Sequence, residues 1–266
     1  MTSEAPGDSN AGVRRGLYVA PFDELAEPRT LIALAVEAEE HGWDGFFLWD
    51  HILYRPPVRA VADPWVALSA IAAHTEHLRL GPLVTPLSRR RVHKVARETA
   101  TLDRLSRGRL ILGVGLGTDR NGELERFGEV VDARERAHRL DAGLDRLTAF
   151  WDGDFEPQPV QRPRIPIWVA ARWPHRRPLR RAARWDGIFP IELPRPEALA
   201  ELADEISGLR GDDPKPFELV VDLEPGLELE PWREAGATWI LTDFGPQPQT
   251  ARVREMVARG PRDDAR

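Results

Sequence analysis

The sequence predicts a single α/β domain that folds as a (β/α)8 TIM barrel. Short apolar runs alternate with amphipathic helical stretches about eight times along the chain, and such alternation is typical of a parallel sheet with right-handed crossovers. The 266 residues suit one barrel domain, and eight units in one domain favour closure of the sheet over an open arrangement.

In the first half of the chain, a strand is expected at 16–21, where an apolar run ends at a proline. Residues 29–41 carry apolar side chains at three- and four-residue spacing, which predicts a helix with one buried face, and Gly42 ends it. The same patterns predict further strands at 45–49, 78–85 and 109–114, and further helices at 64–74, 92–105 and 133–151.

The second half continues the alternation with shorter elements. Strands are expected at 165–170, 187–191, 217–223 and 238–243, and helices at 174–184, 196–209, 231–235 and 250–259. No long linker interrupts the pattern. We therefore expect a disordered N-terminal tail at 1–15, one barrel domain at 16–259 and a C-terminal tail at 260–266.

Composition excludes several classes of function. The formal net charge of −6 gives no global attraction to nucleic acid or anionic lipid. The absence of cysteine excludes disulfides and thiolate nucleophiles. No apolar run is long enough to cross a membrane, and no histidine cluster has metal-ligand spacing. We expect a cytoplasmic protein without a metal that binds neither nucleic acid nor membrane.

In such barrels the chemistry lies where the strands end and the next loops begin. The most informative strand end is Trp49-Asp50-His51, which delivers an acid and an imidazole together. An imidazole titrates near neutral pH and can take or give a proton. A structural role for both residues stays open at this point. Asp222 and Asp243 also stand at strand ends.

A glycine-rich run follows the strand expected at 109–114. Glycines such as Gly113, Gly115 and Gly117 let the backbone approach a flat ring or a phosphate closely. The run lacks the third glycine of the dinucleotide-binding fingerprint, so it is only weak support for nucleotide binding.

The segment 172–184 contains six arginines. They could bind a phosphate or nucleic acid, or could form the solvated basic face of an outer helix, which is the commoner case. Arg172 and Trp173 keep a functional interpretation because they follow a strand.

The stretch 81–117 resembles the luciferase-like monooxygenase family. The similarity rests on Val84-Thr85-Pro86, on the run ETATLDRLS at 98–106 and on the glycine-rich run that follows. Two more matches flank it. They are GWDGFFLWDH at 42–51, and PIWVA at 166–170 followed by LRRAARWDG at 179–187.

The resemblance implies a barrel that holds FMN or the deazaflavin coenzyme F420, with the ring across the barrel mouth. It implies a non-prolyl cis peptide near Leu83-Val84 and an Asp-His pair matching Asp50 and His51. Further cofactor contacts are implied at Leu83, Val84, Thr85, Gly115, Gly117, Ala170, Ala171, Arg172 and Trp173, the last four beside the phosphate.

Two features depart from the family. F420-dependent sugar-phosphate dehydrogenases carry a glutamate directly after the glycine-rich strand end, where this chain has Thr118. The chain is also short for the family, which suggests an open site or closure by a partner subunit; relatives are commonly homodimers.

The sequence therefore predicts an oxidoreductase that uses F420 for hydride transfer to or from a small organic substrate. His51 is the expected proton-handling group, and Asp50 is expected to orient it or to line the ring. An FMN-dependent monooxygenase that uses oxygen is the alternative, and a non-catalytic flavin-binding barrel is the alternative of another class.

Overall fold

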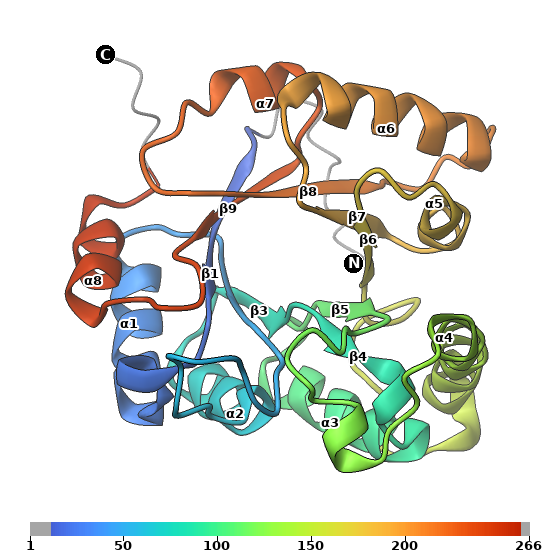
Figure 1. Ribbon diagram of the computed structural model, residues 1–266, viewed down its shortest axis with the longest axis horizontal. Coiled ribbons are helices and arrows are strands. Elements are labelled where there is room, and N and C mark those ends of the chain that lie inside the picture. The colour runs from blue at the N-terminus through green and yellow to red at the C-terminus, as the bar shows by residue number, and fades with distance from the viewer. Residues whose placement is uncertain (1–11, 262–266) are drawn as a thin grey trace, which may run out of the picture.

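A computed structural model describes residues 12–261 and shows a ring of parallel strands surrounded by helices (Figure 1). The strands are β1 (Arg14–Val19), β2 (Gly45–Leu48), β3 (Arg79–Pro82), β4 (Thr85–Pro86), β5 (Leu112–Gly115), β6 (Ile167–Arg172), β7 (Gly187–Ile191), β8 (Glu218–Leu223) and β9 (Trp239–Asp243). They follow the order β3-β2-β1-β9-β8-β7-β6-β5-β4.

The helices alternate with the strands and lie outside them, with α6 and α7 along one side of the ring in Figure 1 and α3 and α4 on another. Their bounds are α1 (Pro28–Glu40), α2 (Pro64–His74), α3 (Val92–Leu105), α4 (Ala133–Ala149), α5 (Arg177–Ala182), α6 (Pro196–Arg210), α7 (Glu230–Glu234) and α8 (Thr250–Arg259). Short helical segments are η1 (Asp23–Ala26), η2 (Leu87–Arg89), η3 (Glu125–Phe127) and η4 (Phe150–Asp154). The predicted TIM barrel is confirmed.

The structure corrects several element boundaries. The single strand predicted at 78–85 divides into β3 and β4 around a cis peptide between Leu83 and Val84. The helix predicted at 174–184 is only the six residues of α5. Strand β1 begins at Arg14, so residues 14 and 15 belong to the barrel rather than to the tail. Residues 1–11 and 262–266 of the predicted tails lie outside the described residues.

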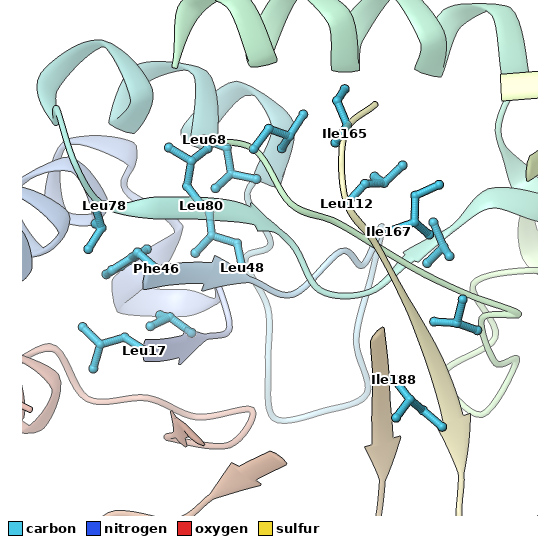
Figure 2. Close-up of a cluster of buried hydrophobic side chains, with 14 of the residues drawn as sticks. Leu17, Phe46, Leu48, Leu68, Leu78, Leu80, Leu112, Ile165, Ile167 and Ile188 are labelled. Atoms are coloured by element: carbon cyan, nitrogen blue, oxygen red, sulfur yellow. The ribbon is translucent and has the colours of Figure 1, made fainter. Parts of the chain in front are cut away.

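Two apolar layers follow from the alternation of side chains along each strand. One layer packs the strands against the helices; Figure 2 shows part of it, with Leu68 of α2 beside Leu80 of β3. The other fills the barrel interior with large aromatic side chains, which include Phe47, Trp168 and Trp239. The interior is therefore a packed core, and only the strand ends can hold a site. Within residues 12–261, no helix is long and apolar enough to span a membrane.

The ring closes where β3 meets the residues that lead into β5. Leu80 donates its N–H to the Arg109 carbonyl at 3.2 Å and accepts a bond from the Ile111 N–H at 2.9 Å. Gly81 lies so close to this segment that a β-carbon on it would stand 1.8 Å from the Ile111 carbonyl oxygen. Gly81 is paired with Phe47 of β2, and the Ile111 N–H is bound to Leu80, so neither segment can move aside at low cost.

Arg109 stabilises the other end of the barrel, where the strands begin. Its buried guanidinium donates to the carbonyls of Ala72, Thr75, Leu78 and Ser106, and to the Thr75 hydroxyl, at 2.7 to 2.9 Å. These acceptors lie at the end of α2, before β3 and after α3, so one side chain joins three segments.

Gly81→Ala should destabilise the fold severely, because the added methyl group overlaps fixed backbone. We expect a loss of about 3 kcal/mol in the free energy of unfolding, measured by urea denaturation followed by circular dichroism. Gly208→Ala in α6 is the matched control. A β-carbon there meets nothing within 4 Å, and alanine should stabilise the helix by roughly 0.5–1 kcal/mol. Equal effects of the two substitutions on the free energy of unfolding would show that the close contact of Gly81 with Ile111 does not limit the residue at position 81.

Candidate active site

His51 is held at the end of β2 by a carboxylate from a distant loop. Its Nδ1 lies 2.8 Å from Oε1 of Glu123, whose Oε2 accepts the Ile52 N–H at 3.0 Å. Glu123 is 1% exposed, and the Arg89 guanidinium lies 3.4 Å from the same Oε1. A carboxylate beside an arginine accepts hydrogen bonds, so Nδ1 carries the proton. Nε2 makes no hydrogen bond among the described residues and can therefore exchange a proton with a bound ligand.

Sequence reasoning missed Glu123, because 72 residues separate it from His51 and it stands in a stretch that was predicted only as a loop. Glu123 partly compensates for the absence of a glutamate at Thr118. The carboxylate that the resemblance places directly after the glycine-rich strand is absent there, but one enters five residues later.

Asp50 plays a different part from the one expected. It is 3% exposed and accepts bonds from Thr85 Oγ1 at 2.8 Å and Trp65 Nε1 at 3.2 Å. Arg89 and Arg90 donate to it at 2.8 to 3.1 Å. Asp50 thus fixes two arginines below the mouth. No hydrogen bond joins it to His51, whose Nδ1 lies against Glu123 instead; a contact of Asp50 with the cofactor ring stays a prediction.

The glycine run has a packing explanation inside the chain. A β-carbon on Gly113 would stand 2.5 Å from a methyl group of Leu83, and one on Gly115 would stand 2.9 Å from a methyl group of Val84. Gly117 has a φ of +70°, which favours glycine. These residues let β5 lie against the Leu83–Val84 segment. A cofactor contact of Gly115 or Gly117 stays a prediction.

The structure gives the side chains of the 83–85 segment different surroundings. Leu83 is 1% exposed within the barrel interior, and the Thr85 hydroxyl is bound to Asp50. Val84 is half-buried and packs against the interior cluster. Of the three predicted contacts, Val84 therefore has the side chain best placed to meet a ring at the mouth.

The segment after β6 presents a charged rim. Ala170 and Trp173 are half-buried, whereas Ala171 points outward and is buried against the helices. Arg172 forms an ion pair with Glu192, which also takes a bond from Arg120 at 3.2 Å. The hydrogen bond from Arg172 holds the pKa of Glu192 below its usual value.

Farther along this segment, Arg176, Arg181 and Arg184 pair with acids of neighbouring helices. This accounts for much of the arginine cluster as helix-to-helix ion pairing.

Aromatic rings form the wall beside His51. The Trp49 ring lies 5.4 Å from Tyr18 and 5.9 Å from Phe22, and His51 lies 5.1 Å from Tyr54, between ring centroids. The Trp49 indole N–H is buried without a hydrogen bond among the described residues. The mouth thus combines a flat apolar wall with a proton-carrying group and a charged rim.

Two carboxyl groups stand at the ends of the next strands around the ring, Asp243 on β9 beside Tyr18 and Asp222 on β8. Burial, together with the charge of Asp243, raises the pKa of Asp222 to about 7. Burial raises the pKa of Asp243 to about 6, against the lowering effect of a bond from the Gly245 N–H. Among residues 12–261, no three acidic or histidine side chains gather in a way that could hold a metal ion.

Asp222→Asn should stabilise the protein in a pH-dependent way. Below pH 4 both folded and unfolded chains keep the proton, so the variant gains nothing. Between pH 4 and pH 7 the unfolded wild-type chain ionises first, and the wild type loses stability that the variant keeps. We expect a gain on the order of 1–3 kcal/mol at pH 8, measured by urea denaturation at a series of pH values.

Asp154→Asn on η4, an exposed position, makes the same chemical change away from the mouth. Its effect should be small and equal at every pH. A flat pH profile for Asp222→Asn would contradict the assignment.

Comparisons with known proteins identify the family and the fold. The family model described as luciferase-like monooxygenase matches residues 4–227. An uncharacterized protein of Mycobacterium tuberculosis is 31% identical over 270 residues, which cover 86% of this chain and 93% of that protein. The F420-dependent tetrahydromethanopterin reductase of Methanopyrus kandleri has a similar fold, with a TM-score of 0.75 and 16% identity over 94% of this chain and 98% of that one.

Two curated enzymes match over a shorter stretch. A phthiodiolone/phenolphthiodiolone dimycocerosates ketoreductase of a Mycobacterium species is 34% identical over 59% of this chain and 45% of its own length. An F420-dependent glucose-6-phosphate dehydrogenase of Beutenbergia cavernae is 38% identical over 52% of this chain and 41% of its own. The chain spans less than half the length of both. With the match to the family model over most of its residues, the chain belongs to the luciferase-like monooxygenase family.

Proposed function

We propose that the protein is an oxidoreductase that uses coenzyme F420 to transfer a hydride to or from a small organic substrate. The observation that carries the proposal is the His51–Glu123 pair at the barrel mouth, 2.8 Å apart. Glu123 fixes the ring through Nδ1 and leaves Nε2 available. Hydride transfer to or from an alcohol or a carbonyl moves one proton as well, and an imidazole held in this way can handle it.

The residues of the mouth fit such a cofactor. Val84, Ala170 and Trp49 are half-buried and apolar where a flat ring would lie. Arg172 stands at the rim, where it could exchange its pairing with Glu192 for an anionic tail. Bound F420 would supply the hydride acceptor or donor, while the chain binds the ring, excludes water from one face and holds the proton.

Relatives named for F420 support the choice of cofactor, since one dehydrogenase with that name is 38% identical over about half of this chain. FMN-dependent monooxygenation is the second candidate, and the family's description favours it. Glu123 weakens the third possibility, a non-catalytic barrel, because one of its two grounds is the missing carboxylate at Thr118; the other is the short chain.

Titration of the purified protein with oxidised F420 and, separately, with FMN tests the proposal. We expect micromolar binding of F420, followed by its fluorescence, and weaker binding of FMN. Arg172→Ala should weaken F420 binding about tenfold by removing the cation at the rim. Arg180→Ala on α5, an exposed arginine, is the matched control and should bind normally.

Selective binding of FMN would move the assignment to a monooxygenase. Failure to bind either cofactor would refute the proposed function while leaving the fold as described.

The Glu123→Gln variant tests how the imidazole is held. In the wild type, nitrogen NMR of His51 should show a protonated Nδ1 and a bare Nε2 whenever the ring is neutral. An amide can donate or accept at that position, so the variant should give a mixture of the two ring tautomers. His138, exposed on α4, serves as the internal reference. An unchanged His51 spectrum in the variant would show that Glu123 does not set the tautomer.

A further inference from the structure

Three polar side chains of the mouth belong to no network within the described chain. They are Tyr18 of β1, Asp222 of β8 and Asp243 of β9. Tyr18 and Asp243 are partners in the β1–β9 register. Asp222 and Asp243 each follow an interior residue, Val220 and Leu241, by two positions. Since side chains alternate along a strand, all three project into the barrel at its carboxyl end.

These groups lack the partners that the buried acids of the mouth possess. Asp50 and Glu123 are each paired with arginine. Among residues 12–261, Asp222 takes no hydrogen bond from another residue, and Asp243 is bonded only within its own turn, by the Gly245 N–H at 2.9 Å and by the Phe244 N–H. Tyr18 is only 8% exposed, yet its hydroxyl makes no hydrogen bond among the described residues. Asp222 and Asp243 are half-buried, and none of the three side chains has a fully buried unpartnered oxygen, so their oxygens open onto the mouth where a ligand could bind them.

The charged and titratable groups around the cluster are all acids or phenols. Asp243 faces Asp222, while Glu224 faces Asp243, and Tyr54 faces Tyr18. No described arginine or lysine forms an ion pair with either aspartate. Burial and the two aspartates hold the pKa of Tyr18 well above its usual value, so its hydroxyl remains a donor. A carboxyl group that keeps its proton beside a like charge is a donor as well.

We propose that Tyr18 and Asp222 donate hydrogen bonds to one oxygen of the substrate, the carbonyl oxygen of a ketone or the hydroxyl oxygen of the corresponding alcohol. Burial, together with the nearby Asp243, favours the protonated form of Asp222. This assignment deepens the proposed function and rests on it for the reaction, since it names the substrate class and the side of the mouth that binds it.

The chemistry of the two donors suits a carbonyl oxygen. That oxygen has two lone pairs and can accept both bonds at once. A tyrosine hydroxyl beside a carboxylic acid held neutral stabilises negative charge that develops on an oxygen. His51 follows β2, which flanks β1 on the side away from β9 and β8. An alcohol hydroxyl that accepts the two bonds can donate its own hydrogen to Nε2 of His51, which then takes the proton that leaves that oxygen as the hydride leaves the carbon.

Binding of cyclohexanone, with methylenecyclohexane as the probe of the same shape without oxygen, tests this assignment. Ligand-observed NMR would follow both probes on the full chain, with and without F420. We expect cyclohexanone to bind more tightly than the alkene. Tyr18→Phe and Asp222→Leu should each weaken cyclohexanone binding about tenfold and leave alkene binding unchanged.

The pH dependence separates a donor from a merely structural residue. Wild-type affinity for cyclohexanone should fall as the pH rises from 6 to 8, because Asp222 loses its proton. Asp222→Asn keeps an N–H donor at every pH, so its affinity should stay constant. Asp154→Asn is the matched control and should follow the wild type. Thermal melting would establish that each variant is folded.

Equal binding of the two probes, or cyclohexanone affinity unaffected by Tyr18→Phe and Asp222→Leu, would overturn the assignment even if F420 binds. Absence of cyclohexanone binding would do the same. If cyclohexanone shows the expected dependence but neither F420 nor FMN binds, the oxygen site stands and the proposed cofactor function fails.

Discussion

The close contact between β3 and the entry to β5 is the constraint on which the rest of the barrel depends. Here the ring of strands closes, and the space for a β-carbon at Gly81 is already filled by the Ile111 carbonyl. Just beyond this contact the chain divides into β3 and β4, and Thr85 is brought to the Asp50 carboxylate. That carboxylate holds Arg89, which in turn lies against Glu123. The position of His51 is therefore linked, contact by contact, to the closure of the sheet.

Local patterns in the sequence were sufficient to predict the architecture. Apolar periodicity placed α2, α3 and α8 at their observed bounds, because each helix buries one face and needs no distant partner to define it. The segment 78–85 was less well predicted, since its division depends on packing against β5. The resemblance located the Leu83–Val84 cis peptide, which no propensity of the residues themselves indicates.

The site was harder to predict for the same physical reason. Asp50 and His51 were recognised from their place after a strand, but their partners are set by tertiary contacts. Glu123 lies in a loop without apolar periodicity, and Tyr18 was not singled out, because a tyrosine within an apolar run is typical of a strand that faces a barrel interior. The glycine run was interpreted in terms of a ligand, whereas its observed neighbours are Leu83, Val84 and Pro86 of the chain itself. A sequence shows which residues are acids, but it does not show which arginine or lysine the fold will bring beside each acid.

The mouth contains acids of two kinds, distinguished only by their neighbours. Asp50 and Glu123 are paired with arginines, while burial raises the pKa of Asp222 and of Asp243, neither of which has an arginine or lysine partner among the described residues. A substitution that brought a lysine beside Asp222 would convert the second kind into the first.

The packing of the glycine run also has an evolutionary consequence. Gly113 and Gly115 face Leu83 and Val84 so closely that a larger residue on one strand requires a smaller one, or a shifted backbone, on the other. These positions should change together among descendants of this chain. Correlated replacement between them would report the geometry of the barrel, and would persist in copies that had lost the reaction altogether.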